Sequence, residues 1–467
     1  MSPRGPGGAD VRKTGIAGAR ERPGIGLTDR RGTPGTGLTD ARGKPGAREI
    51  GLGDGAGGDR VSPGPPHPLE WPVYDDGVAA RVAELVTLGR TFDYDYGPEL
   101  AGLERSFAER HGRAHALALT SGTAGLLAAY FALGIGPGDE VIVPDLTFFS
   151  TASPLFLLGA VPVLCDAGDA DGNVAAADVE ALVTPRTVAI VVTHLWGHSC
   201  DMDALRAVAD RRGLALVEDC SHAHGSTFRS RPVGSMGDIS IFSVGGRKLI
   251  SGGMGGMLLT DSEDVFARAC LLTNFRHRTD LTIDAARYQP FLLTGFGGNF
   301  RISTPGAVLA QSHLDRLDEL VERRGANMSA LSAGLGALPG VRPSPVAEGV
   351  TMGAWYDGVV EVTPECPFSR DELVAAGQER GLKVRAPATR PLHVLPLFQG
   401  AAPDWSPVVA AAVRGAAAMN DRPFPRSTEL FARWMKLPVN FLWEENSPLV
   451  GAYLEAFDDA FSMARTA

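Results

Sequence analysis

The chain has 467 residues, of which 44% are hydrophobic, and it carries a formal net charge of −10 at pH 7. This length predicts two or three globular domains, and the acidic balance disfavours nucleic acid and anionic membranes, which leaves a small molecule as the expected partner. The five cysteines lack the close pairing of a disulfide framework or a zinc site, so we expect a cytoplasmic protein.

Neither a membrane span nor a secretory signal is expected. The longest nearly apolar run, residues 152–165, is interrupted by Pro154 and Pro162 and is shorter than a bilayer requires. The N-terminus contains arginines but lacks the apolar core that a secretory signal needs.

Residues 1–66 are rich in Gly, Pro, Arg and Asp and contain a near-repeat that begins at Gly26 and again at Gly37. A segment of this composition buries too little apolar surface to offset its ordering entropy, so we expect a disordered extension. Its glycines neither follow a strand nor open a helix, which argues against a phosphate-binding loop.

The first cofactor-like turn lies between a strand and a helix, at residues 120–124. Free N–H groups and the dipole at a helix N-terminus attract anions, and Gly122 allows an anion to approach the backbone closely. A simple helix cap is the alternative interpretation. The pattern predicts a helix at 99–111, a strand at 114–119 and a helix at 125–133.

A buried strand over 141–144 leads into a loop that carries Thr147 and Phe148. An aromatic ring just beyond a strand can stack on a flat cofactor, because ligands of open α/β sheets bind at that edge; ordinary core packing is the alternative. Further strands alternate with helices, which predicts βαβ units and a mostly parallel sheet. The strands are expected at 161–165, 188–193, 214–218 and 239–244, and the helices at 177–182 and 202–212.

Asp219 follows directly after the strand at 214–218. A carboxylate in that position can keep a pyridine nitrogen protonated, which makes a pyridoxal ring an electron sink, although a strand-end Asp also commonly caps a helix. His222 and His224 nearby raise a metal site as a further alternative. The local cluster supplies too few ligands for one, so no metal is predicted.

Lys248 lies in a glycine-rich loop, residues 242–256, after an apolar strand. A desolvated lysine can form a Schiff base with an aldehyde cofactor, and the hydroxyl of Ser243 can add to a phosphate cradle. An isolated lysine is usually a surface residue. The coincidence of strand, serine, glycines and two other cofactor-like turns favours the Schiff base.

The C-terminal part predicts a smaller α+β domain. We expect a large cofactor-binding domain over 67–318 and a small domain over 319–467, joined by a long helical pattern from 304 to about 335. The later elements are a strand at 355–362 and helices at 370–380, 408–419 and 447–464.

Six motifs in order resemble the DegT/DnrJ/StrS family of pyridoxal-phosphate-dependent sugar aminotransferases. The resemblance extends from about residue 70 to the C-terminus. The motifs are Ser121-Gly122-Thr123, Pro144 with Thr147 and Phe148, residues 193–197, residues 218–225, Ser243 with Lys248, and Asn299-Phe300-Arg301.

The resemblance implies a fold-type I α/β enzyme with a mostly parallel central sheet flanked by helices. It implies pyridoxal 5'-phosphate as the cofactor and a homodimer whose active sites lie at the subunit interface. The implied reaction moves an amino group from an amino acid, glutamine or glutamate, to a keto-sugar or keto-cyclitol. The implied setting is secondary-metabolite biosynthesis, antibiotics included, or surface-sugar biosynthesis.

The resemblance also implies a role for each motif residue. Lys248 would form the Schiff base and shuttle a proton, Asp219 would pair with the pyridine nitrogen, and Phe148 would stack on the ring. His222, where the family usually has Gln, would lie near the phenolic oxygen. The other implied residues are Gly122, Thr123, Ala124 and Ser243 at the phosphate, Asn299 of the partner subunit beside them, and His393 near the substrate.

Met254 departs from the family pattern, which usually has Glu there. The loss of that carboxylate from the loop behind the cofactor is expected to alter the substrate pocket or the anchoring of the loop. Two other functions stay open: dehydration of a keto-sugar, and a non-catalytic, regulatory role. Relatives that dehydrate generally have His where this chain has Lys248, and intact Lys248 and Asp219 argue against a non-catalytic protein.

Overall fold

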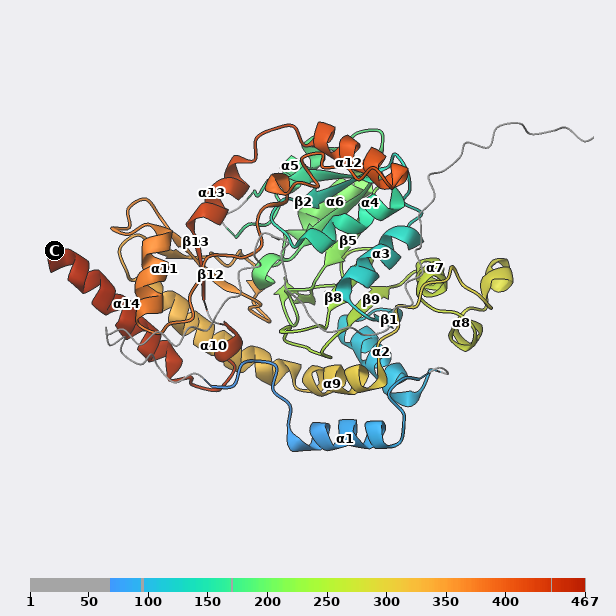
Figure 1. Cartoon of the computed structure of the whole chain (residues 1–467), viewed down its shortest axis with the longest axis horizontal. Coiled ribbons are helices and arrows are strands. Elements are labelled where there is room, and N and C mark those ends of the chain that lie inside the picture. The colour runs from blue at the N-terminus through green and yellow to red at the C-terminus, as the bar shows by residue number, and fades with distance from the viewer. Residues whose placement is uncertain (1–67, 94–95, 169–170, 438, 467) are drawn as a thin grey trace, which may run out of the picture. The chain divides into compact units, whose positions relative to one another are not determined.

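The structure is a computed structural model that describes residues 68–93, 96–168, 171–437 and 439–466 (Figure 1). The predicted disordered extension, residues 1–66, lies outside the described residues. No helix in the described ranges is both long enough and apolar enough to cross a membrane.

The described residues form a seven-stranded central sheet in the order β1-β9-β8-β5-β4-β2-β3. β9 is antiparallel to both of its neighbours, and the other adjacent pairs are parallel. The sequence therefore predicted the mostly parallel sheet correctly but missed β9, because its start lies in a run of glycines. The strands are β1 (His115–Leu119), β2 (Glu140–Pro144), β3 (Val161–Cys165), β4 (Thr187–Thr193), β5 (Ala215–Asp219), β8 (Ile239–Ser243) and β9 (Gly256–Thr260).

Helices cover both faces of this sheet, because its strands are almost continuously apolar. On one face lie α3 (Gly122–Ala132), α4 (Ser153–Leu158) and α7 (Glu263–Thr273), with α12 (Pro407–Met419) beside α4. On the other face lie α2 (Pro98–His111), α5 (Ala176–Ala181), α6 (Met202–Arg212) and α9 (Thr304–Asp315). The predicted α/β fold class is confirmed.

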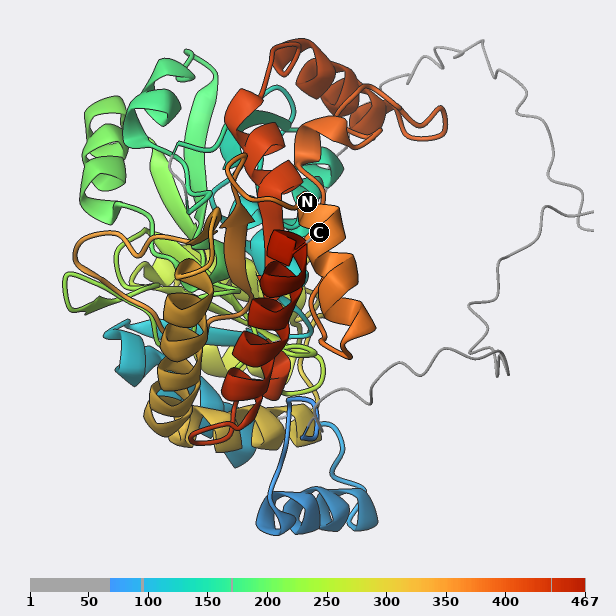
Figure 2. The same ribbon diagram turned by 90° about the vertical axis from the view of Figure 1, so that its left-hand side faces the viewer.

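A second sheet, β10-β12-β13, lies in the C-terminal part and is antiparallel. Three helices pack on it around a separate apolar core, with α14 between α10 and α11, as Figure 2 shows for the gold to red helices. The elements are β10 (Val341–Pro343), β12 (Gly358–Val362), β13 (Trp434–Leu437), α10 (Leu317–Gly336), α11 (Arg370–Glu379) and α14 (Leu449–Thr466).

The remaining elements are short or peripheral. A small sheet joins β6 (Thr227–Phe228), β7 (Arg231–Pro232) and β11 (Val350–Thr351). The other helices are α1 (Asp76–Thr87), α8 (His277–Thr282) and α13 (Pro425–Arg433). The domain boundary predicted at residue 318 falls in the first turn of α10 and stays a prediction.

The long helix predicted from residue 304 is two helices, which corrects that prediction. Arg316 has φ −107° and ψ 11°, so the chain leaves helical geometry between α9 and α10. α9 packs on the core beside α2, whereas Met328, Leu331 and Leu335 of α10 enter the core of the C-terminal sheet. The apolar spacing continues through the break, so periodicity alone does not reveal it.

The loop that carries Lys248 connects β8 to the antiparallel β9. Its ends are closed by bonds from the N–H of Val244 to the carbonyl of Gly255, 2.9 Å, and from the N–H of Gly246 to the carbonyl of Gly253, 2.8 Å. Lys248 therefore lies beyond the carboxyl end of β8, at the edge where ligands of such sheets bind.

Gly256, the first residue of β9, lies against the start of α3. A Cβ atom there would lie 2.3 Å from the carbonyl carbon of Ser121 and 2.6 Å from the nitrogen of Gly122. Only glycine fits without moving this turn. Gly256 therefore fixes the position of the N-terminus of α3 relative to β8 and β9.

We expect Gly256→Ala to lower the free energy of unfolding by about 1–3 kcal/mol, the usual cost of overpacking, as measured by urea denaturation. Gly102→Ala is the matched control, because a Cβ atom at that helical position meets nothing within 4 Å. Relief of glycine's entropy cost should stabilise the control by roughly 0.5–1 kcal/mol. A Gly256→Ala protein as stable as the wild type would contradict the proposed contact.

Candidate active site

A cavity of about 390 Å³ lies at the carboxyl ends of the parallel strands. One wall comes from segments that follow the strands of the large sheet, and the other comes from the C-terminal part of the chain. The first wall includes Ser121, Gly122, Thr123, Thr147, Phe148, Thr151, Thr193, Trp196, Asp219, Ser221, His222, Ser243 and Lys248. The second wall includes Tyr356, Asp357, Arg385, Thr389, Arg390, Phe431, Trp434 and Lys436.

Most of the predicted site residues line this one cavity. The structure brings together seven of them: Gly122, Thr123, Phe148, Asp219, His222, Ser243 and Lys248. Ala124, Asn299 and His393 are not among its lining residues.

The first turn of α3 makes one end of the cavity suitable for an anion. Ser121 caps the helix by accepting a hydrogen bond from the N–H of Ala124 at 3.1 Å, so that N–H is already used. Gly122 and Thr123 lie in the first turn, where N–H groups have no acceptor within the helix. A Cβ atom at Gly122 would lie 3.1 Å from the Cβ of Ser243 and 3.4 Å from the Oγ of Ser221.

Asp219 is held at the middle of the cavity by a chain of hydroxyl groups. Its Oδ2 accepts a hydrogen bond from Thr151 at 2.8 Å, and its Oδ1 accepts one from the N–H of Ser221 at 3.1 Å. Thr151 is bonded to Thr147, and Thr147 to Thr193, at 2.7 and 2.9 Å. This chain crosses from β4 to β5 and fixes the direction in which the carboxylate points.

Lys248 is the partly buried amine of the cavity. Its Nζ lies 3.6 Å from the centroid of the Tyr356 ring, a cation–π distance. Burial lowers the pKa of Lys248 to about 7, although the carboxylates of Asp219 and Asp357 act in the opposite direction. A substantial fraction of this amine is therefore neutral near neutral pH.

A buried ion pair lies beside Lys248 on the opposite wall. The Nζ of Lys436 bonds the carboxylate of Asp357, and the two side chains are about nine-tenths buried. The ammonium of Lys436 also lies 5.5 Å from the centroid of the Trp196 ring. Burial raises the pKa of Asp357 and lowers that of Lys436, and each partner's charge opposes the shift of the other.

His222 is held between two aromatic rings. It is stacked on Tyr356 with ring centroids 4.1 Å apart and on Trp196 with centroids 5.6 Å apart. Burial and the positive charges of Lys248 and Lys436 hold the pKa of His222 well below its usual value. The imidazole is therefore neutral, and its buried Nδ1 has no partner among the described residues.

The three residues that do not line the cavity have other surroundings. Ala124 is used in the helix cap. Asn299 is exposed, and its Oδ1 accepts a hydrogen bond from Arg301 at 2.9 Å. His393 bonds Asp145 through Nδ1 at 2.6 Å and stacks on Phe424, three residues after Arg390 in the cavity wall.

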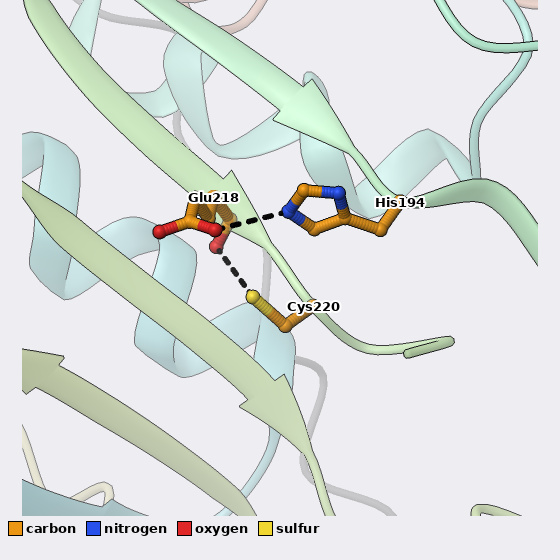
Figure 3. A group of neighbouring side chains, drawn as sticks. All are labelled: His194, Glu218 and Cys220. Atoms are coloured by element: carbon orange, nitrogen blue, oxygen red, sulfur yellow. Dashed lines mark hydrogen bonds and ion pairs between the residues drawn. The ribbon is translucent and has the colours of Figure 1, made fainter. Parts of the chain in front are cut away.

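A separate group, His194, Glu218 and Cys220, brings together donor atoms of the kind that bind metals (Figure 3). The N–H of Cys200 donates to Nδ1 of His194 at 3.1 Å, so Nε2 carries the proton and donates to Glu218 at 3.1 Å. Glu218 also accepts bonds from the N–H groups of residues 234, 236 and 237.

Both ring nitrogens of His194 and both oxygens of Glu218 are thus used within the protein. Burial raises the pKa of Glu218, but the bonds from His194 and from backbone N–H groups outweigh that effect, so the net pKa is lowered. The carboxylate is therefore ionised and anchors the loop after β5. The group supports the fold around the cavity and does not require an ion.

His224, which sequence reasoning paired with His222, is also engaged elsewhere. Its Nε2 lies 2.9 Å from the carbonyl of Ser243. Burial lowers the pKa of His224 to about 3, so it is neutral and donates to that carbonyl. It therefore supports the end of β8.

The comparisons with known proteins agree with this geometry. The model of the DegT/DnrJ/EryC1/StrS aminotransferase family matches residues 77–419. The chain belongs to this family. It is a pyridoxal-phosphate-dependent aminotransferase, as the sequence predicted.

Two relatives in the family show how far the similarity extends. The chain is 34% identical over 320 residues to the GDP-perosamine synthase of Caulobacter vibrioides, which covers 68% of this chain and 84% of that protein. It is 37% identical over 295 residues to the L-glutamine:2-deoxy-scyllo-inosose aminotransferase of Streptomyces fradiae, covering 61% and 69%.

A solved structure is similar over nearly the whole described chain. The crystal structure of 3-amino-5-hydroxybenzoic acid synthase has a TM-score of 0.72 and 31% identity, over 86% of this chain and 100% of that chain. The aminotransferase from Psychrobacter cryohalolentis has a TM-score of 0.74 at 26% identity, over 86% and 100%. The fold of this aminotransferase is therefore shared with solved relatives.

The cavity fits the cofactor of the family. The space that a Cβ atom would fill at Gly122 is bordered by the hydroxyl-bearing side chains of Ser221 and Ser243, next to the N-terminus of α3. This end suits a phosphate group. Asp219, Phe148 and Lys248 line the same cavity, with types of side chain that suit a pyridine nitrogen, a flat ring and an aldehyde.

Sequence reasoning missed the second wall, above all Tyr356, Asp357 and Lys436. The sequence predicts a strand over 355–362 that would include Tyr356 and Asp357, but β12 begins at Gly358. The available signal was a charged residue within an otherwise apolar stretch, at Asp357 and at Lys436. A buried charge needs a partner, although the sequence does not identify that partner.

Met254 lies outside the cavity. Its side chain is 69% exposed and is not among the lining residues. Met254 therefore does not touch the cavity of its own subunit, and any effect of this residue on the substrate pocket there would act through the rest of the loop. The N–H of Met254 donates to the carbonyl of Gly252 at 2.9 Å, so the backbone of the loop is closed without a carboxylate at this position.

We expect the pH at which Lys248 becomes half-reactive in the cofactor-free protein to lie near 7, as measured by reductive methylation and mass spectrometry. In Asp357→Asn this midpoint should fall, because a charge that raises the Lys248 pKa is lost and Lys436 is left uncompensated. Asp404→Asn, an exposed carboxylate outside the cavity, should leave it unchanged. A midpoint that rises in Asp357→Asn would contradict the proposed electrostatics.

Proposed function

We propose that this aminotransferase moves an amino group from an amino acid, glutamine or glutamate, to a keto-sugar or keto-cyclitol. The observation that carries the proposal is Lys248, a partly buried amine of lowered pKa in the same cavity as Asp219, Phe148 and the anion-binding turn of α3. Such an amine can accept a proton and return it near neutral pH.

The names of the relatives support this choice of substrates. One relative is a GDP-perosamine synthase, and another takes its name from L-glutamine and 2-deoxy-scyllo-inosose. A further relative, 34% identical over 313 residues, is the spore coat polysaccharide biosynthesis protein SpsC of Bacillus subtilis. We therefore place the reaction in secondary-metabolite or surface-sugar biosynthesis, with antibiotic biosynthesis as one setting.

The predicted site residues of the first wall each have a proposed task. Bound pyridoxal phosphate would supply the aldehyde and the electron sink. Lys248 would bind that aldehyde as a Schiff base and later move the proton, and Asp219 would hold the pyridine nitrogen protonated. Phe148 would stack on the ring, and neutral His222 would donate a hydrogen bond to the phenolic oxygen.

At the phosphate end, the proposed residues are those around the first turn of α3. Gly122 and Thr123 would donate backbone N–H groups, and Ser243 would add its hydroxyl. The N–H of Ala124 already donates to Ser121, so Ala124 would act on the phosphate only as part of the positive N-terminal end of α3. His393 would act near the substrate by orienting the loop that carries Arg390.

We further propose a homodimer in which Asn299 reaches the phosphate of the other subunit. Asn299 is exposed and lies away from the cavity lining of its own chain. The segment before it exposes large apolar side chains, with Phe291 39%, Leu293 71% and Phe296 51% exposed. Apolar surface of this kind favours contact with another protein, and a second copy would cover it.

We also propose a cytoplasmic location. The five cysteines, all within the described residues, form no disulfides, and four of them are buried. Thiols kept reduced in this way suit a reducing compartment.

The first test is spectroscopic. Wild-type protein incubated with pyridoxal phosphate should gain the visible absorbance band of a lysine-bound cofactor, and Lys248→Ala should not gain it. Protein loaded instead with pyridoxamine phosphate should regain the band on addition of a keto-sugar or a keto-cyclitol.

Two outcomes would overturn the proposal at different points. If wild-type protein develops no band, the cofactor role of Lys248 is wrong. If the band forms but no ketone restores it, while an amino acid alone is turned over, then another pyridoxal reaction is the function.

The second test mixes two inactive variants, Lys248→Ala and Asn299→Ala, and lets their subunits exchange. If Asn299 acts in the partner's site, each hybrid dimer has one intact site, so about a quarter of wild-type turnover should return. Asn299 acting within its own chain would give no recovery. Should Asn299→Ala alone keep full turnover, its role at the phosphate is wrong.

A further inference from the structure

The segment 69–74, which we call the strap, contacts the loop of Lys248 although the two are far apart in the sequence. The indole Nε1 of Trp71 donates a hydrogen bond to the carbonyl of Lys248 at 2.9 Å. The hydroxyl of Tyr74 donates to the carbonyl of Ser251 at 2.8 Å. Glu70 forms an ion pair with Arg247 at 3.0 Å. Three side chains of the strap thus hold three positions of one short loop.

His313 of α9 forms hydrogen bonds with both the strap and the lysine loop. Its Nδ1 accepts a hydrogen bond from the N–H of Ser251 at 3.2 Å, so Nε2 carries the proton and donates to the carbonyl of Val73 at 3.0 Å. Burial lowers the pKa of His313 to about 4, which keeps the ring in this neutral form. The ring also packs against Trp71 and Tyr74, with centroids 4.5 and 4.6 Å apart.

Trp71 is also connected to the ring that covers the amine of Lys248. The guanidinium of Arg324, which is fully buried, lies 5.5 Å from the centroid of Trp71 and donates to the carbonyl of Ala354 at 3.1 Å. Two residues further along the chain, Tyr356 contacts the Nζ of Lys248. Trp71 therefore bonds the backbone of the lysine directly and is linked through Arg324 to the segment that limits the lysine side chain.

The C-terminal part of the chain holds the strap in place. The N–H of Trp71 donates to the carbonyl of Asn440 at 2.9 Å, and the indole of Trp443 donates to the carbonyl of Leu69 at 2.8 Å. Trp71 is only 2% exposed. The strap is thus fixed independently of the lysine loop, so it can act as a reference point for that loop.

We propose that the strap is a positioning element for Lys248, in which Trp71 and Tyr74 fix the backbone of the lysine loop. This inference rests on the proposed role of Lys248. Glycines at 245, 246, 252 and 253 flank the loop and would allow its backbone to move. The strap removes that freedom, which leaves the amine to move only through its own side chain. Precise placement matters because a small displacement of a reacting group costs much of the rate.

Two variants test the strap. Trp71→Phe deletes the indole donor, and Tyr74→Phe deletes a single hydroxyl with little change in packing. Trp405→Phe is the control, because Trp405 is 82% exposed and lies outside the strap. Each protein is measured for kcat and KM of the amino donor, for its thermal unfolding midpoint, and for the pH midpoint of Lys248 methylation without cofactor.

We expect Trp71→Phe to lower kcat about tenfold while KM stays within about twofold, because the defect lies in placement and not in substrate binding. The methylation midpoint should rise, since a looser loop lets the amine reach water and regain part of its usual pKa. Tyr74→Phe should shift both quantities in the same direction by less. Trp405→Phe should match the wild type.

The inference is overturned if Trp71→Phe and Tyr74→Phe change only the unfolding temperature and leave kcat and the methylation midpoint at wild-type values. That result would give the strap a purely structural role. A wild-type protein that forms no visible band with pyridoxal phosphate would instead remove the proposed function. The methylation midpoint would still report whether the strap positions Lys248, so the two failures are distinguishable.

Discussion

The withdrawal of one amine from water is the constraint on which the rest of the site depends. A lysine inside a cavity loses hydration, and every charge near it then acts more strongly than it would in solution. The surroundings of Lys248 are arranged accordingly. Asp357 and Lys436 neutralise each other, and His222 is kept uncharged between two rings. The charges of Asp357 and Lys436 are therefore held in one ion pair, and the amine of Lys248 is close to half-protonated near pH 7.

The topology of the sheet explains how such distant residues meet. In parallel strands every carboxyl end lies at the same edge, so Thr193, Asp219 and Ser243 end neighbouring strands although more than twenty residues separate each from the next in the sequence. The antiparallel strand β9 then returns the chain along β8, and Gly256 brings its first residue against the turn that begins α3. One close backbone contact thus sets the distance between the anion-binding end and the lysine loop.

Much of this could be predicted from the sequence, because strand ends carry both the structural and the chemical signals. The strand at 161–165 and the helix at 202–212 agree with β3 and α6 residue for residue, and seven predicted residues share one cavity. What could not be predicted depends on packing between distant segments. The partner of Asp357, the break at Arg316 and the contacts of Trp71 leave no local pattern, since each arises only when two separate cores come together.

Glu218 and Asp219 show how much depends on strand register. The two acids are adjacent in β5, and successive side chains of a strand point to opposite faces. Glu218 therefore enters the protein interior, where backbone N–H groups and His194 satisfy it, while Asp219 faces the cavity. A shift of one residue in β5 would exchange an anchoring acid for a reactive one. Length changes are therefore tolerable in the connections on either side of β5, which can absorb them, but not within the strand before Glu218, where one added or lost residue would exchange the faces of the two acids.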